Sequence, residues 1–333
     1  MEENFSAPNK SFLPRILQNA KHVLSLLPMI VTVYLQLFLY TVPLLTVIVL
    51  AREWAPTPYY WEQKWGTTLA WIDQNRRLAL GFVPSFIAAI MYWLVGAIFL
   101  VFDFTGWMSK YKTQPGTNEP LQAPRLTKVV KCVLINQFVV GMSLTLLMHE
   151  ITRLTSTKEQ LDLNKFKELP SISTMLIHLA VFATVREVLN YYTHRLMHHR
   201  LFYKNVHKQH HMWSAPIALI SIYCHPVEHI IVNAFPAITG PILMKSHPLV
   251  LWSWFLLVQP WSMIIHSGYH FPLFPCPEFH DFHHMTSTSN FGNLTIMDAI
   301  HGTDKQWKKS ESYKRSFTLF GVKPAREIIK RLQ

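Results

Sequence analysis

Residues 29–50 read MIVTVYLQLFLYTVPLLTVIVL, and no acidic or basic residue occurs between Lys21 and Arg52. About 20 apolar residues in a helix cross the ~30 Å hydrocarbon core of a bilayer. The run is much longer than the roughly 7 to 15 residues of a signal-peptide core, and no small-x-small cleavage site follows it before Arg52. It therefore predicts a retained membrane-spanning helix.

Further apolar runs extend this pattern along the chain. Leu78–Phe102, Cys132–His149 and Leu169–Val185 predict three more spans. Ile217–Met244 and Leu249–Ile265 are also apolar, but the first contains His225, Pro226, Glu228 and His229. Polar groups at membrane depth must face protein or a wet cavity, so a bent or re-entrant hairpin is expected there. The predicted fold is an all-α integral membrane protein with about four transmembrane helices plus this hairpin, and a histidine-rich helical cap.

Composition excludes other classes of protein. The 333 residues are 50% hydrophobic and only 15% charged, which excludes a disordered chain. Eleven glycines without a GxGxxG or P-loop pattern argue against a nucleotide-binding fold, and three cysteines cannot build a disulfide framework. A net charge of +12 fits nucleic-acid binding or the basic flanks of membrane helices. The apolar runs favour the second interpretation.

Basic residues predict the orientation in the membrane. Cytosolic flanks carry excess Lys and Arg, and such an excess marks both the segment after Thr303 and the loop between the second and third spans. The N-terminus, residues 194–211 and the chain from 266 onward then share the cytosolic side. The expected organisation is a cytosolic N-terminal segment (1–28), transmembrane helices (29–190), a histidine-rich region with the hairpin (191–305) and a basic cytosolic tail (306–333).

Histidines supply the candidate site. Fifteen of the 18 lie at or after position 194, in the patterns HRLMHH at 194, HKQHH at 207, HSGYH at 266 and HDFHH at 280. On a helix, residues spaced i, i+3 and i+4 share a face. Imidazole binds Fe, Zn, Cu and Ni, and ten ligands are too many for one ion, so two metals are expected. The candidate ligands are His194, His198, His207, His210, His211, His266, His270, His280, His283 and His284. The sequence does not decide between His198 and the adjacent His199 as the ligand at that position.

Other side chains are candidates for supporting roles. Ligand imidazoles usually donate their second N–H to a carboxylate or a carbonyl. The candidates for this second layer, some also alternative ligands, are His199, His225, His229, Glu187, Glu228, Asp281 and Asp298. Three prolines in 271–279 predict a turn that lets the last two clusters converge, and Cys276 within it is a packing residue or a soft ligand.

These motifs resemble the fatty acid hydroxylase superfamily of membrane di-iron oxidases, and its C-4 methylsterol oxidase branch in particular. HRLMHHRLFYKNVHKQHHMWSAP at 194–216 is similar to the first two histidine boxes of that branch. HPVE at 225, HSGYH at 266, HDFHHM at 280, NFGN at 290 and GTD at 302 follow in similar order and spacing. The resemblance covers about residues 180–305.

The resemblance implies an activity. It implies two non-haem iron ions, O₂ as co-substrate, and oxidation of an unactivated C–H bond of a sterol in the endoplasmic reticulum membrane. No haem, flavin or nicotinamide fingerprint occurs in the chain, so cytochrome b5 and its reductase are the expected electron donors. No nucleic-acid partner is expected. A fatty acyl or sphingolipid hydroxylase and a sterol desaturase are alternatives, and a catalytically silent membrane scaffold is an alternative of another class.

Overall fold

The computed structural model describes residues 25–57, 59–118, 121–157 and 162–332, so the predicted N-terminal segment 1–28 lies almost wholly outside the described residues. The described chain is helical, and its single β-type pairing is an isolated bridge between Lys112 and Tyr269. This all-α architecture confirms the expected fold class.

Within the described residues, five helices are long and apolar enough to cross a membrane. They are α2 (Leu27–Glu53), η1 with α4 (Arg77–Phe82, Val83–Thr105), α5 with η3 and α6 (Ala123–Leu134, Ile135–Gly141, Met142–Thr155), α8 (Ile172–Met197) and α12 (Pro248–His266). The first four match the four predicted spans, although α8 begins three residues after Leu169, because uncharged apolar runs of this length satisfy their backbone polar groups only as helices.

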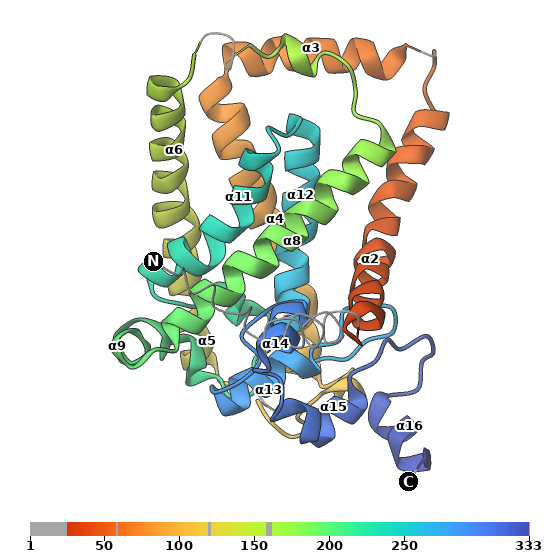
Figure 1. The fold of residues 1–333 in the computed structure, drawn as a ribbon, viewed down its shortest axis with the longest axis vertical. Helices are drawn as coiled ribbons and strands as arrows, with labels where there is room; N and C mark the ends of the chain where they lie inside the picture. The colour runs from red at the N-terminus through yellow and green to blue at the C-terminus, as the bar shows by residue number, and fades with distance from the viewer. Residues whose placement is uncertain (1–24, 58, 119–120, 158–161, 333) are drawn as a thin grey trace, which may run out of the picture.

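The fifth spanning helix is one limb of the predicted hairpin. The other limb is α10 (Pro226–Glu228), η8 (His229–Ala234) and α11 (Phe235–Leu243), whose middle turns are π-helical. The hairpin packs closely on α8, since a Cβ at Gly240 would lie 2.9 Å from the Cα of Phe182. Figure 1 shows both limbs turning below the level of α3.

A second π-helical segment, η3, makes a polar contact with the irregular chain that precedes the hairpin. Asn136 in η3 is fully buried, and its side-chain amide donates to the carbonyls of Ile222 (3.0 Å) and Cys224 (2.9 Å). These carbonyls belong to the irregular segment around η7 (Ala218–Ile222), which precedes the hairpin. The amide therefore supplies donors to backbone that no regular helix satisfies.

Helix α3 (Tyr60–Gln74) lies across the end of the molecule opposite the histidines (Figure 1). No apolar run predicts a span in these residues, and the helix is too short and too polar to cross a membrane. Its buried face contains Trp65, Leu69 and Ile72, and the indole of Trp65 donates to the carbonyl of Phe166 at 2.6 Å. The contact joins α3 to η4 (Asn164–Phe166) in the connection to α8.

Short helices gather at the other end, below the spanning helices in Figure 1. The backbone N–H of Thr113 donates to the carbonyl of Gly268 (2.8 Å), and the Gln114 amide donates to the carboxylate of Asp281 (3.1 Å). The loop after α4 therefore lies against the histidine segments, as the predicted orientation requires. The elements here are η2 (Ser109–Tyr111), α9 (Arg200–Phe202), η5 (Tyr203–His207), η6 (His210–Met212), α13 (Glu278–Thr286), α14 (Ile296–His301), η9 (Trp307–Lys309), α15 (Glu311–Arg315) and α16 (Ala325–Leu332).

Candidate metal centre

Four chain segments bring imidazoles to one place. The last turn of α8 carries His194 and ends at His198, and η5 and η6 follow directly with three more histidines. α12 ends at His266, and α13 supplies the remaining three. The histidines form two compact sets, in each of which one nitrogen per ring lies within 4.8 Å of all the others. The first histidine group is His194, His198, His207, His211 and His283, and the second histidine group is His210, His266, His280 and His284.

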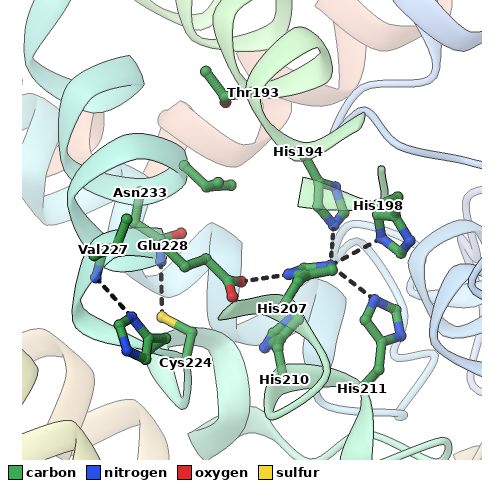
Figure 2. Close-up of polar contacts among 12 residues, drawn as sticks. Thr193, His194, His198, His207, His210, His211, Cys224, Val227, Glu228 and Asn233 are labelled. Carbon is green, nitrogen blue, oxygen red and sulfur yellow. Dashed lines mark hydrogen bonds and ion pairs between the residues drawn. The ribbon is translucent and has the colours of Figure 1, made fainter. Parts of the chain in front are cut away.

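The first group surrounds the Nε2 atom of His207, as Figure 2 shows for four of its members. This nitrogen lies 3.2 Å from Nε2 of His194, 2.8 Å from that of His198 and 3.0 Å from that of His211. Nε2 of His283 closes the set at 3.1 Å from Nε2 of His211. Five imidazoles therefore aim the same ring atom at one point.

The second group is built in the same way. Nε2 of His266 lies 2.8 Å from Nε2 of His280 and 3.4 Å from Nε2 of His210. Nε2 of His284 is buried and has no hydrogen-bond partner in the described structure. An unpaired buried ring nitrogen is costly unless something binds it.

The two groups are neighbours. The ring centroids of His211 and His284 are 4.9 Å apart, and those of adjacent residues His210 and His211 are 5.7 Å apart. His210 and His211 belong to different groups, so consecutive residues reach two sites. This arrangement can hold two metal ions side by side, which is the dinuclear pattern expected from the number of histidines.

The geometry and the protonation state both suit metal ions. Ligand nitrogens at about 2.1 Å from an ion and at right angles to each other lie ~3.0 Å apart, which is close to the separations in both groups. Burial lowers the pKa of His207, His210, His280, His283 and His284 well below its usual value, and the neighbouring imidazoles lower it further. A neutral imidazole is the form that binds a metal.

Backbone carbonyls fix the second ring nitrogen of four of the nine group histidines. Nδ1 of His194 lies 2.7 Å from the carbonyl oxygen of Phe291, and Nδ1 of His283 lies 2.7 Å from that of Ser289. Nδ1 of His266 meets the carbonyl of Ser262 at 2.6 Å, and Nδ1 of His284 meets that of Trp213 at 3.1 Å. Such partners place the proton on Nδ1 and leave Nε2 as the ligand atom. These four positions cannot be predicted from the sequence, because any residue can supply a carbonyl.

Glu228 is the one predicted carboxylate that contacts a group histidine directly. Its Oε1 lies 2.8 Å from Nδ1 of His207, and both side chains are buried (Figure 2). A carboxylate on the far side of a ligand imidazole fixes the ring and raises its basicity. Glu228 therefore orients the central ring of the first group, which lies next to the Nε2 atoms of three other members.

Glu187 and Asp298 contact no group histidine among the described residues. Instead they bind the backbone of the segment 291–294, which in turn contacts His194. Glu187 accepts hydrogen bonds from the backbone N–H groups of Asn293 (2.9 Å), Leu294 (2.8 Å) and Met297 (3.2 Å). Asp298 accepts from those of Phe291 (2.8 Å) and Gly292 (2.6 Å). The two carboxylates thereby hold the carbonyl of Phe291 against His194. Burial raises the pKa of Asp298, and its hydrogen bonds oppose that shift.

Gly292 lies where only a glycine fits. A Cβ there would be 2.8 Å from Oδ2 of Asp298 and 2.8 Å from Oε1 of Glu187. The glycine of the NFGN motif is therefore explained by sterics, because the backbone there passes close to two buried carboxylates.

One predicted ligand lies apart from both groups. The HSGYH spacing predicts one helical face for His266 and His270, but α12 ends at His266 and Gly268 adopts a left-handed φ of 71°. The turn directs Nε2 of His270 to the carbonyl of Phe317 at 2.9 Å, and its Nδ1 lies 3.8 Å from Sγ of Cys276. His270 and Cys276 therefore lie in the packing beneath the C-terminal segment.

The remaining predicted residues also lie outside the two groups. His199 is exposed and accepts a hydrogen bond from the N–H of Leu201, whereas His198 joins the first group. His225 caps α10, and Nδ1 of His229 is buried without a hydrogen bond to any described residue. Asp281 binds Gln114 and contacts no group histidine in the described structure; burial raises its pKa to about 7.

Comparison with known proteins extends the similarity beyond the site. A family model described as "Fatty acid hydroxylase" matches residues 179–303. "Fatty acid hydroxylase domain-containing protein 2" of Homo sapiens is 36% identical over 284 residues, covering 84% of this chain and 83% of that protein. "Methylsterol monooxygenase 2-2" of Arabidopsis thaliana is 30% identical over 238 residues, covering 68% of this chain and 86% of that protein.

A third relative, "Fatty acid hydroxylase ahd1" of Mycosarcoma maydis, is 29% identical over 265 residues, covering 78% of this chain and 65% of that protein. No solved structure matches the chain. The family model covers every residue of both histidine groups, and the full-length relatives extend the match into the spanning helices. The chain therefore belongs to the fatty acid hydroxylase family of membrane enzymes.

Proposed function

We propose that the protein is a membrane-bound di-iron lipid oxidase that uses O₂, and that its substrate is a C-4 methylsterol. The observation that carries the proposal is the pair of adjoining histidine groups, with nine imidazoles whose ligand atoms converge on two points. Their position supports it as well, because α8 and α12 deliver His194 and His266 from apolar spans where lipid lies.

The residues of the two groups would hold one iron each, at Nε2 of their imidazoles. Iron supplies the redox chemistry that zinc lacks, namely the reduction of O₂ for attack on an unactivated C–H bond. The balanced reaction is R–CH₃ + O₂ + 2 e⁻ + 2 H⁺ giving R–CH₂OH + H₂O. The protein's own part is to fix the ligands through Glu228 and the Phe291 carbonyl, and to bury the site from water.

The choice of a sterol rests on the similarity to methylsterol monooxygenases and on the resemblance of the histidine boxes to that branch. Repeating the reaction on one C-4 methyl group would give an alcohol, an aldehyde and finally a carboxylate. A second candidate is hydroxylation of a fatty acyl chain, which the similarity to a protein named fatty acid hydroxylase favours. Both candidates use the same centre and differ in the lipid that reaches it.

Electrons must come from a separate protein, which we propose to be cytochrome b5 with its reductase. The segment after Thr303 contains nine Lys and Arg against three Asp and Glu, and such a basic face steers an acidic partner. Its elements α15 and α16 lie at the same end of the molecule as the histidine groups (Figure 1). We propose the endoplasmic reticulum membrane as the location, with both termini in the cytosol.

The experiment combines metal analysis with lipidomics. Purified protein from iron-replete cells should contain about two irons per chain. In cells lacking the protein, accumulated 4-methyl sterols would support the leading proposal, and altered 2-hydroxy acyl lipids would support the second candidate. His210→Ala with His283→Ala removes one ligand from each group and should abolish rescue of the lipid profile, while the exposed His199→Ala should rescue fully. Full rescue by the double variant would refute an enzymatic role.

A further inference from the structure

An apolar cavity of about 230 Å³ lies between α2, α8 and α12. Leu37, Ala183 and Val258 are representative of its walls, one from each helix. Phe38 also lines it and is 47% exposed, so the cavity reaches the surface that faces lipid. α2 is held beside α8 by a hydrogen bond between the hydroxyls of Tyr34 and Thr184.

One charged side chain, that of Arg186, lines this cavity among the described residues. Its guanidinium forms no ion pair or hydrogen bond with another side chain in the part of the chain that the structure describes, although the neighbouring Glu187 carboxylate interacts with it electrostatically. The nearest acid in sequence, Glu187, is committed elsewhere, since its carboxylate accepts three backbone N–H groups. The cavity therefore combines apolar walls with one cation whose N–H donors have no side-chain acceptor among the described residues.

An unpaired cation inside a bilayer is costly, and intramembrane Arg residues face a partner or a ligand pathway. Guanidinium carries five N–H donors in a planar fork that matches a carboxylate. An apolar wall with this fork at one end is complementary to a molecule that has an apolar body and a single carboxylate.

The cavity also leads toward the metal centre. On α8, Ala183, Arg186, Asn190 and His194 follow at helical spacings of three and four, so they share a face. Arg186 is two turns, or ~12 Å along the axis, from His194, and it is the lining residue of α8 closest to that histidine. Leu294 lines the cavity as well and belongs to the segment whose Phe291 carbonyl meets His194.

We infer that this cavity binds a carboxylate-bearing lipid, with the carboxylate paired to Arg186 and the apolar body between α2, α8 and α12. The inference rests on the proposed function, because it takes the cavity to be the place where the enzyme's lipid lies. It narrows the substrate class to acidic lipids or to lipids that become acidic during oxidation. Two sources share this chemistry, a free fatty acid and a sterol oxidised to the acid at C-4.

The test is equilibrium binding to the purified full-length protein without electron donor, so that no turnover occurs. The probes are two matched pairs, palmitate with hexadecanol and a 4-carboxysterol with its 4-hydroxymethyl counterpart. Hydrogen bonds to a charged partner are stronger than those between neutral groups, so the wild-type protein should prefer the acid of at least one pair by about tenfold or more. The pair that shows the preference identifies the source.

Three variants complete the design. Arg186→Gln should abolish the preference for the acid, and Arg186→Lys should restore part of it, because the charge returns without the planar fork. Arg200→Gln, an exposed arginine just beyond the same helix, should retain the full preference. Iron content and gel-filtration profile show whether each variant is folded.

Equal binding of acid and neutral lipid by the wild-type protein would overturn the inference. An unchanged acid preference in folded Arg186→Gln would also overturn it. If Arg186→Gln does not fold, the wild-type preference and its partial retention in Arg186→Lys decide the matter. Acid-selective binding in a protein that oxidises no lipid would defeat the proposed function and leave the acid site standing, so the two failures are distinguishable.

Discussion

Gly292→Ala is expected to weaken the metal centre without touching a ligand. The new Cβ would lie 2.8 Å from a carboxylate oxygen of Asp298 and of Glu187, whereas ordinary contacts begin at 3.4 Å. At least one carboxylate must therefore move by about 0.6 Å. Both are buried and hydrogen-bonded to the backbone that presents the Phe291 carbonyl to His194.

The size of the effect follows from those hydrogen bonds. Stretching a bond near 2.8 Å by this amount takes it beyond the range of about 2.7–3.2 Å. The loss of one hydrogen bond to a charged acceptor costs about 1.5–3 kcal/mol. If the cost falls on the state that holds metal, iron affinity drops by about 10- to 150-fold.

The assay is iron retained per chain against a series of chelator concentrations, measured together with the melting temperature. Gly66→Ala is the matched control, because nothing lies within 4 Å of its new Cβ on α3, and it should behave as wild type or be slightly more stable. Identical retention curves and melting temperatures for the two variants would refute the account of the 291–294 segment.

Three further predictions concern single side chains. Glu228→Ala removes the acceptor at Nδ1 of His207 and should weaken iron binding by about 10- to 100-fold in the same chelator assay; wild-type retention would contradict the role of Glu228. His270→Ala should keep the full iron content, since this ring lies outside both histidine groups, and loss of one iron per chain would make His270 a ligand after all. Gly240→Ala should lower the melting temperature, because its Cβ would lie 2.9 Å from the backbone of Phe182, and an unchanged temperature would show that α8 and the hairpin are not closely packed.

The spanning helices were predictable from long apolar patterns in the sequence. The position of His270 was not, because it depends on the residue at which α12 ends. Apolar runs of about 20 residues predicted the spanning helices because helix is the structure that satisfies backbone groups in lipid. The spacing HxxxH holds for His194 and His198, which end α8, but not beyond α12, where Gly268 turns the chain and carries His270 away. No periodicity indicates such a turn.

The outer layer of the site was only partly predictable, for a related reason. Carboxylates near the histidines could be named from the sequence, but their partners could not. Glu187 lies about two turns before His194 on α8 and binds backbone more than 100 residues later. Backbone carbonyls leave no residue-type signal at all, so the acceptors at Phe291, Ser289, Ser262 and Trp213 required the structure.

The division of the ligands along the chain has a consequence for biosynthesis. Each histidine group includes members from α13, namely His283 in the first and His280 with His284 in the second. The first set is complete only when the ribosome has passed residue 283 and the second when it has passed residue 284, after the five candidate spanning helices of the described chain have been made. Metal loading must then be a late event in maturation, and a chain truncated before α13 would retain the five candidate spanning helices yet lack members of both sets.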